Sequence, residues 1–255
     1  MPHNIREPSL PIPSIYKISS FINSIIMKKN ENNQTKSRRG FLEMLVTGAT
    51  TLGLLSFASP TTLKTEQKLL DGDDPWFDKI KGKHRIVFDA TQPHGIYPFA
   101  WPRVFLMTNA ATETPEKDCS VVVVLRHSAI AYAFENRLWA TYKFGEVFKA
   151  EDPATNAPSV RNPFWKPNVG DFKIPGVGNI DIGINELQDR GVMFCVCDTA
   201  ITVYSAAVAN GMKQDAAQVK KEWLTGLLPG IHVVPSGVWA VGRAQEHGCG
   251  YCFAG

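Results

Sequence analysis

The chain has 255 residues, of which 44% are hydrophobic and 20% charged, and its formal charge is +3. Seven of its 27 Lys and Arg residues lie in the first 58 positions, so the remaining 197 residues are nearly neutral and are enough for one domain with a sizeable core. Those residues contain no dense basic face with interleaved aromatic side chains, so nucleic acid is not an expected partner.

The first expected element is an export signal. Arg38 and Arg39 precede Phe-Leu and a mildly apolar run at 41–58, a pattern typical of twin-arginine signals. The run contains a Glu, three Thr and two Gly, so it is too short and too weakly hydrophobic for a stable membrane span. Ser56-Phe57-Ala58 supplies the small residues that a signal peptidase accepts. We therefore expect 1–58 to be a leader and the protein to be periplasmic or otherwise exported through the twin-arginine route.

The segments around this signal set the expected domain boundaries. Met27 is an alternative start, because initiation there places several basic residues ahead of the apolar run, as export signals require. Residues 59–83 are polar and charged, and Asp71-Gly72-Asp73-Asp74-Pro75 is a turn cluster. This stretch is expected to be a linker, with the globular domain at 84–255.

Five strands are expected in the domain, at 85–90, 121–126, 192–197, 231–235 and 251–254. The second is apolar at every position from Val121 to Leu125, as a parallel strand covered on both faces must be. Helices with apolar residues three and four apart are expected at 99–111, 129–144, 180–189, 199–210, 216–228 and 238–247. This alternation predicts a three-layer α/β/α sandwich with a mainly parallel five-stranded sheet and functional sites at the carboxyl ends of the strands.

Residues 151–178 interrupt the alternation and are interpreted as an insertion. They hold five prolines and the aromatic pair Phe164-Trp165. Long connections without regular structure are typical of lids, binding loops or oligomer contacts. Phe164 and Trp165 are therefore candidate substrate-binding residues.

Five cysteines lie in the expected domain: Cys119, Cys195, Cys197, Cys249 and Cys252. An odd number cannot all pair within one chain, and a protein folded in the cytosol before export acquires its fold without disulfides, so thiol or metal chemistry is favoured over a disulfide framework. The Cys-x-x-Cys pair at 249–252 suggests a metal, but Cys249 lies at the amino end of the last expected strand and Cys197 closes another strand at the opposite edge. No metal site is predicted, and no cofactor is required.

Cys197 is the first candidate for a reactive residue. It ends an expected strand, where a helix beginning near Thr199 directs free N–H groups and its positive dipole end toward the sulfur and stabilises a thiolate. Asp198, expected to cap that helix, adds a negative charge that moderates this effect. Cys195 points to the same face of the sheet. For both cysteines the alternative is a small buried hydrophobic residue.

Three further candidates follow the first two strands and are expected at the same edge. His127 is a candidate proton partner for Cys197 if their strands are neighbours, and otherwise a ring bonded to a loop carbonyl. Arg126 is either a clamp on an anionic substrate or a surface cation. His94, between Pro and Gly, is either a binding residue or a turn residue.

Four segments together resemble the DsrE/DsrF-like family over about residues 84–255: Val121 to His127, Leu187 to Cys197, Val233 to Val238 and Gln245 to Tyr251. The resemblance implies a flavodoxin-like layered domain, commonly a homo-oligomer. It also implies a cysteine at the end of the third strand that carries sulfane sulfur as a persulfide, and Cys197 matches that position.

These observations predict an exported protein that binds or relays sulfane sulfur, as a sulfurtransferase or a sulfur carrier. Its expected partners are small sulfur species or a sulfur-carrying protein. Two alternatives remain open: a non-catalytic module that binds a metal or small ligand, and an oligomeric scaffold without chemistry.

Overall fold

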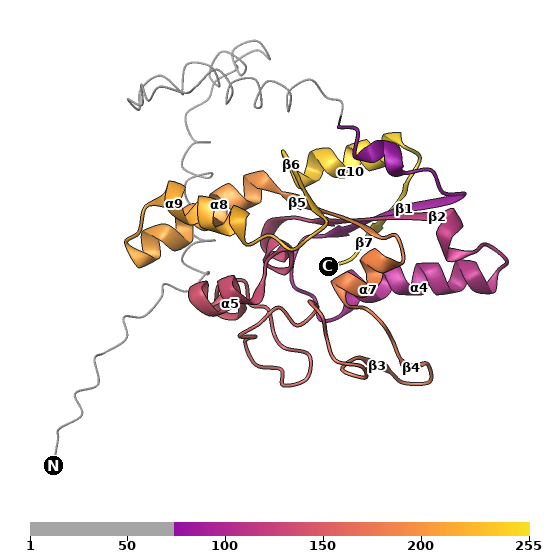
Figure 1. Cartoon of the computed structure of the whole chain (residues 1–255), viewed down its shortest axis with the longest axis horizontal. Coiled ribbons are helices and arrows are strands. Elements are labelled where there is room, and N and C mark those ends of the chain that lie inside the picture. Colours follow the sequence, from indigo (N-terminus) through magenta and orange to yellow (C-terminus); the bar gives the residue numbers. More distant parts are fainter. Residues whose placement is uncertain (1–73) are drawn as a thin grey trace, which may run out of the picture. The chain divides into compact units, whose positions relative to one another are not determined.

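A central sheet of five parallel strands organises residues 74–255, the part of the chain that this computed structural model describes (Figure 1). The strands are β1 (His84–Ala90), β2 (Cys119–Leu125), β5 (Met193–Cys197), β6 (Ile231–Val234) and β7 (Gly250–Phe253). Each lies within two residues of its predicted bounds. The predicted class, a layered α/β fold of flavodoxin-like type around a parallel five-stranded sheet, is confirmed.

The strand order, β6-β5-β2-β1-β7, is information that the sequence did not provide. The chain moves across the sheet in one direction from β1 to β6, and β7 then pairs with the other side of β1. Counted along the chain the order is fourth, third, second, first, fifth, which differs from the second-first-third-fourth-fifth order of flavodoxin itself. Because every pairing is parallel, all five carboxyl ends meet at one edge of the sheet.

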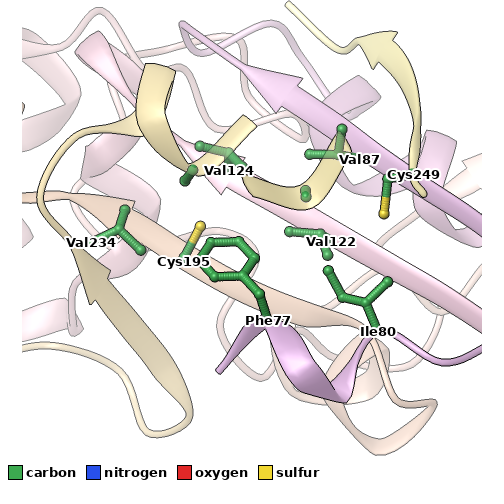
Figure 2. Close-up of a cluster of buried hydrophobic side chains, with 10 residues drawn as sticks. Phe77, Ile80, Val87, Val122, Val124, Cys195, Val234 and Cys249 are labelled. Atoms are coloured by element: carbon green, nitrogen blue, oxygen red, sulfur yellow. The ribbon is translucent and has the colours of Figure 1, made fainter. Parts of the chain in front are cut away.

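The two faces of the sheet are covered by different helices (Figure 1). On one face α10 (Gly237–Glu246) packs against β1, β2, β5 and β7. Figure 2 shows the core beneath it, which is built from alternate strand residues, including Val122, Val124 and Cys195. On the other face α4 (Tyr97–Ala111) packs against β1 and β2, and α7 (Ile184–Asp189) packs against α4.

The segment before β1 belongs to this core, although residues up to 83 were expected to be a linker. The short 3-10 turn η1 (Phe77–Lys79) and the residue after it bury Phe77 and Ile80 against the α10 face. The hydroxyl of Ser120, at the start of β2, accepts hydrogen bonds from the backbone N–H groups of Lys81 and Gly82. The folded part therefore begins upstream of His84. The expected leader, Met27 and residues 59–73 of the expected linker lie outside the described residues.

The single helix expected at 129–144 was a wrong prediction. Three short elements occupy this region: the 3-10 helix η3 (His127–Ala133), α5 (Asn136–Tyr142) and α6 (Phe144–Val147). The helix is interrupted because Phe134 and Glu135 adopt extended backbone and Phe134 pairs with Leu227, while Lys143 adopts a left-handed conformation. An aromatic cluster around Trp223 and Phe144 then packs these elements against α9.

The remaining helices follow the predicted pattern more closely. α8 (Asp198–Met212) and α9 (Ala216–Thr225) connect β5 to β6 and pack against each other. The expected helix at 180–189 begins only at Ile184, after Gly183, whose N–H donates to the Glu186 carboxylate and so caps the helix. Within residues 74–255 no helix is both long enough and apolar enough to cross a membrane.

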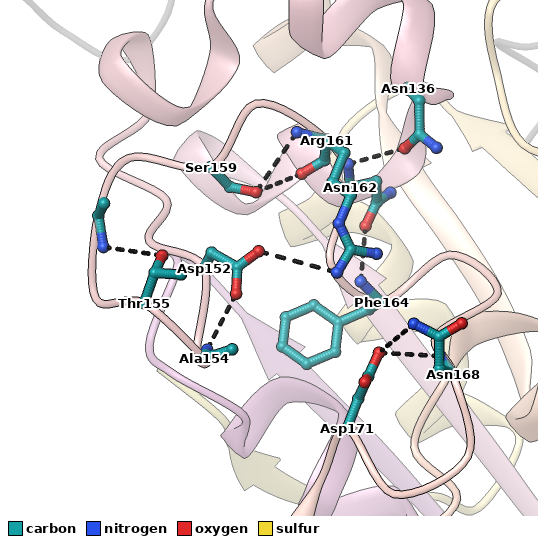
Figure 3. A network of polar contacts seen from close by, with 11 residues as sticks. Asn136, Asp152, Ala154, Thr155, Ser159, Arg161, Asn162, Phe164, Asn168 and Asp171 are labelled. Atoms are coloured by element: carbon teal, nitrogen blue, oxygen red, sulfur yellow. Dashed lines mark hydrogen bonds and ion pairs between the residues drawn. The ribbon is translucent and has the colours of Figure 1, made fainter.

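The insertion at 151–178 is largely irregular. At its end two short antiparallel strands, β3 (Lys173–Ile174) and β4 (Gly178–Asn179), form a hairpin. The insertion is held in place by the fully buried Asn162, whose side chain forms hydrogen bonds with backbone groups (Figure 3). The amide Nδ2 donates to the carbonyls of Tyr132 and Phe134 at 2.9 and 3.0 Å, and Oδ1 accepts from the N–H of Phe164 at 3.1 Å. These bonds fix the insertion to η3.

Candidate functional site

Cys197 lies at the carboxyl edge of the sheet, at the junction of β5 and α8. It is itself the N-cap of α8, because its Sγ accepts a hydrogen bond from the N–H of Ala200 at 3.3 Å. The residue is 6% exposed and is therefore buried. The first turn of α8 directs a backbone N–H group at its sulfur.

Asp198 was expected to cap this helix, and that prediction was wrong. It is the first helical residue, and its carboxylate lies 2.9 Å from Nζ of Lys220 on α9. The cap is supplied by sulfur because Cys197, not Asp198, has the extended backbone that precedes the first turn. Lys220 also offsets the negative charge that was expected to oppose thiolate formation.

Arg126 follows β2 and is held at the same edge by a buried carboxylate. Its Nε and Nη2 donate to Oδ1 and Oδ2 of Asp89, at 2.6 and 2.9 Å, and the Tyr251 hydroxyl donates to Oδ2 at 3.0 Å. Asp89 is 3% exposed. The hydrogen bonds that Arg126 donates to Asp89 raise the pKa of the guanidinium; partial burial opposes this rise, and the negative charge of Asp89 adds to it.

The aliphatic part of the Arg126 side chain lies beside Gly237, the first residue of α10. A Cβ on Gly237 would sit 2.5 Å from Cβ and 2.9 Å from Cδ of Arg126, so only glycine at this position leaves room for the arginine side chain. Among the described residues Nη1 of Arg126 has no hydrogen-bond partner. The arrangement thus presents a thiol, a partly neutralised guanidinium with free N–H groups and the starts of two helices at one edge of the sheet.

His127 lies next to this group but is not bonded to Cys197. Its ring is exposed and meets Tyr204 of α8 edge-on, with the tyrosine hydroxyl 3.3 Å from Nε2. Tyr204 follows Cys197 by seven residues, about 10 Å along the helix. His127 therefore reaches the helix that Cys197 caps, at a point two turns farther along.

His94 lies at a different part of the edge, beyond β1. Its ring is exposed and packs against Tyr97, 5.0 Å away between centroids. A Cβ on Gly255 would lie 2.5 Å from Cβ of His94, so the residue borders the segment that follows β7. Two strand spacings, about 10 Å, separate β1 from β5 and Cys197.

Phe164 was expected to bind substrate, but its side chain is a core residue. It is fully buried and stacks on Phe99 and Phe172, with ring centroids 4.2 and 5.1 Å away. This core lies on the α4 side of the sheet, whereas Cys197 shares the face of Cys195 under α10. The half-buried ring of Trp165 contacts Nζ of Lys166, at 5.4 Å from its centroid.

All five cysteines are free, and the other four differ in position from Cys197. Burial raises the pKa of the Cys195 thiol well above its ordinary value. Burial likewise raises the pKa of Cys249 to about 11, against a smaller opposite effect of Arg85. Within residues 74–255 no three side chains of metal-binding type come together.

Sequence reasoning missed Asp89, Tyr251 and Gly237. A signal for Asp89 was present, because it directly follows the apolar run Ile86 to Phe88, and a buried aspartate has to be paired. Tyr251 and Gly237 gave no such signal, since their roles depend on which strands are neighbours.

Comparison with protein-family models, with characterised proteins and with solved structures finds no match to this chain.

Proposed function

We propose that this protein binds or relays sulfane sulfur through Cys197. The observation that carries the proposal is the position of the sulfur, which caps α8 and accepts the Ala200 N–H at the carboxyl edge of the sheet. Arg126 follows β2, the strand that pairs with β5, and so lies at the same edge of the sheet. Backbone N–H groups and basic side chains near a sulfur are typical surroundings of nucleophilic cysteines.

The transfer needs only a sulfur donor. The Cys197 thiolate attacks the terminal sulfur of a persulfide or the sulfane sulfur of thiosulfate. The donor S–S bond breaks, and the thiolate or sulfite leaves with the electron pair. Cys197 then carries the sulfur as a persulfide until an acceptor thiolate removes it by the same step. The sulfur keeps its oxidation state throughout, so no separate oxidant or reductant takes part.

Arg126 is the proposed clamp for the anionic donor. Asp89 holds the guanidinium by Nε and Nη2, which leaves Nη1 to donate to a sulfur or sulfonate group. Arg126→Met should therefore weaken capture of thiosulfate more than capture of a neutral organic trisulfide. An equal effect on both donors would contradict the clamp role.

The central experiment is mass spectrometry of the intact protein after incubation with thiosulfate or polysulfide and alkylation. One added sulfur atom is expected on Cys197 and none in Cys197→Ser. Cys252→Ser is the matched control, because Cys252 is a partly exposed thiol on β7, and it should take up sulfur normally. Labelling of other cysteines while Cys197 stays unmodified would end the proposal.

His127 is proposed to accept the thiol proton through solvent, since it is exposed near α8 and not bonded to the sulfur. A base near the site speeds removal of the thiol proton, so sulfur uptake should be slower in His127→Gln than in the wild type, while the final amount of sulfur on Cys197 stays the same. Uptake at the wild-type rate in the variant would exclude His127.

We further propose that the protein is exported by the twin-arginine route, on the strength of Arg38 and Arg39 before the apolar run. Replacement of both arginines by lysine should retain the protein in the cytosol, and replacement of Lys28 and Lys29 by arginine is the control. Unchanged export of the Arg38→Lys/Arg39→Lys variant would contradict the route.

A further inference from the structure

A second concave site lies at the amino edge of the sheet, opposite to Cys197. It is a cavity of about 970 Å³ formed where the chain enters β1, β2 and β5. Most residues of the segments 79–83, 116–120 and 189–193 line it. A volume of this size is at the upper end of the range for small-molecule sites, about 300 to 1,000 Å³.

Lysine side chains dominate the charge of this cavity: Lys79, Lys81, Lys83 and Lys117 all line it. None of the four forms an ion pair with another described residue. The described part of the chain has equal numbers of basic and acidic residues, so a group of four unpaired lysines around one cavity is a local concentration of charge.

The acidic residues of the cavity do not cancel this charge. Glu116 is already neutralised, because it accepts from Arg103 at 2.7 Å and from Arg190 at 3.1 Å. Asp118 and Asp189 are exposed and line the same cavity. Four unpaired lysines against two unpaired aspartates leave an excess of positive charge.

The backbone that carries the lysines is held in place. The buried Ser120 hydroxyl accepts the N–H groups of Lys81 and Gly82 at 3.1 and 2.8 Å, and the Lys83 N–H donates to the carbonyl of Asp118 at 2.6 Å. A Cβ on Gly82 would lie 2.4 Å from the Ser120 nitrogen, so glycine is required for this close approach. Fixed backbone reduces the entropy that the site loses on binding.

We propose that this cavity binds a small polyanion that carries at least two phosphate- or sulfate-type charges. Lysine ammonium groups bind phosphate as compact point charges, and several of them around one cavity favour a multiply charged ligand over a single carboxylate. Charged side chains outnumber the one long apolar side chain in its walls, that of Met193, so charge is the main feature that a ligand would recognise. The site does not depend on Cys197, which closes β5 at the other edge.

The test is calorimetric titration of the protein with inorganic pyrophosphate. The wild type should bind, with an affinity that falls as salt is added. Lys81→Ala/Lys83→Ala should weaken binding by about tenfold or more, since two of four unpaired cations are lost. Lys173→Ala/Lys221→Ala removes two exposed lysines outside the cavity and should leave the affinity unchanged.

Cys119 provides a second measurement that needs no variant, because its partly exposed thiol lines the cavity. Pyrophosphate should slow alkylation of Cys119 and leave that of Cys252 unchanged. The proposal would be overturned if pyrophosphate gave no heat of binding and did not slow the alkylation of Cys119. Binding of a single-stranded oligonucleotide without binding of pyrophosphate would overturn it too, because the surface would then recognise a polyanionic chain. Neither result bears on sulfur uptake by Cys197.

Discussion

Arg126 and Asp89 form a two-point ion pair that joins the ends of β2 and β1, with Nε 2.6 Å from Oδ1 and Nη2 2.9 Å from Oδ2. Tyr251 of β7 donates to the same carboxylate, so one buried acid connects three neighbouring strands. The pair therefore has two consequences: it stabilises the edge of the sheet, and it fixes the Arg126 side chain, whose aliphatic part lies beside Gly237.

Replacement of Asp89 by Asn should lower the free energy of unfolding by about 2 kcal/mol, because it leaves a partly buried guanidinium without its counter-charge. Urea unfolding monitored by circular dichroism would measure the loss. Glu246→Gln removes a carboxylate from an exposed pair with Arg243 and should cost less than about 0.5 kcal/mol. Equal losses in the two variants would show that Asp89 has no special role.

Two glycines of α10 provide a matched test of the space around Arg126. Gly242 has open space where a Cβ would lie, so Gly242→Ala should raise stability by about 0.5 to 1 kcal/mol. Gly237 is the first residue of the helix, where alanine gains less helix propensity, and Gly237→Ala pushes a methyl group into the Arg126 side chain. We expect it to be less stable than Gly242→Ala and to take up sulfur more slowly. Thermal unfolding and the sulfur-uptake rate measure these effects, and identical behaviour of the two variants would contradict the contact.

Cys197 should have a structural effect that can be separated from its chemistry. A serine in its place can still accept the Ala200 N–H, whereas an alanine cannot. Cys197→Ala should therefore be about 1 kcal/mol less stable than Cys197→Ser in urea unfolding, while both variants lose sulfur uptake. The cap would be refuted by an alanine variant as stable as the serine variant.

Asn162 should be among the most sensitive polar residues of the insertion. Asn162→Ala leaves the Tyr132 and Phe134 carbonyls and the Phe164 N–H without their side-chain partner, in a region that is fully buried. A loss of about 3 kcal/mol or more is expected from chemical unfolding. Asn168→Ala, which removes an exposed hydrogen bond to Asp171, is the control and should cost little.

Glu116 should make stability depend on acid pH. Partial burial raises the pKa of its carboxyl, but hydrogen bonds and charges from Arg103 and Arg190 outweigh burial, so the net pKa is lowered. A carboxyl with a lower pKa in the folded state stabilises the protein above its unfolded-state pKa, and this contribution is lost as pH falls through the folded-state pKa. Between about pH 5 and pH 3 the wild type should lose more stability than Glu116→Gln. Parallel pH profiles of the two proteins would contradict this expectation.

The sequence predicted the layered α/β architecture well because the residue composition of a strand indicates which of its faces are buried. The apolar run from Val121 to Leu125 could only be a covered parallel strand, and the alternation in β5 correctly placed Cys195 and Cys197 on one face. The helix expected at 129–144 failed for the opposite reason. The apolar residues that suggested one helix lie in separate short elements that pack around Trp223. No local signal indicated the extended backbone at Phe134 and Glu135.

The positions of the candidate residues were predictable only in part. Cys197 and Arg126 lie at the expected edge because Cys197 closes and Arg126 follows a recognisable strand, and their roles stay predictions. Phe164 was misassigned because an aromatic residue in a proline-rich stretch looks exposed until the partners that bury it are known. Contacts between elements far apart in the sequence depend on strand order. Strand order is set by long-range pairing, which the periodicity of hydrophobic residues does not encode.

Phe77 and Ile80 have a consequence for any shortened form of this protein. They precede β1 in sequence but fill the space between α10 and the sheet, against Val122 and Cys195. Cleavage of the chain before Asp74 leaves both side chains in place. Cleavage just before His84 would remove them and leave a cavity between α10 and the sheet, so the shortest form expected to stay folded retains Phe77 and Ile80.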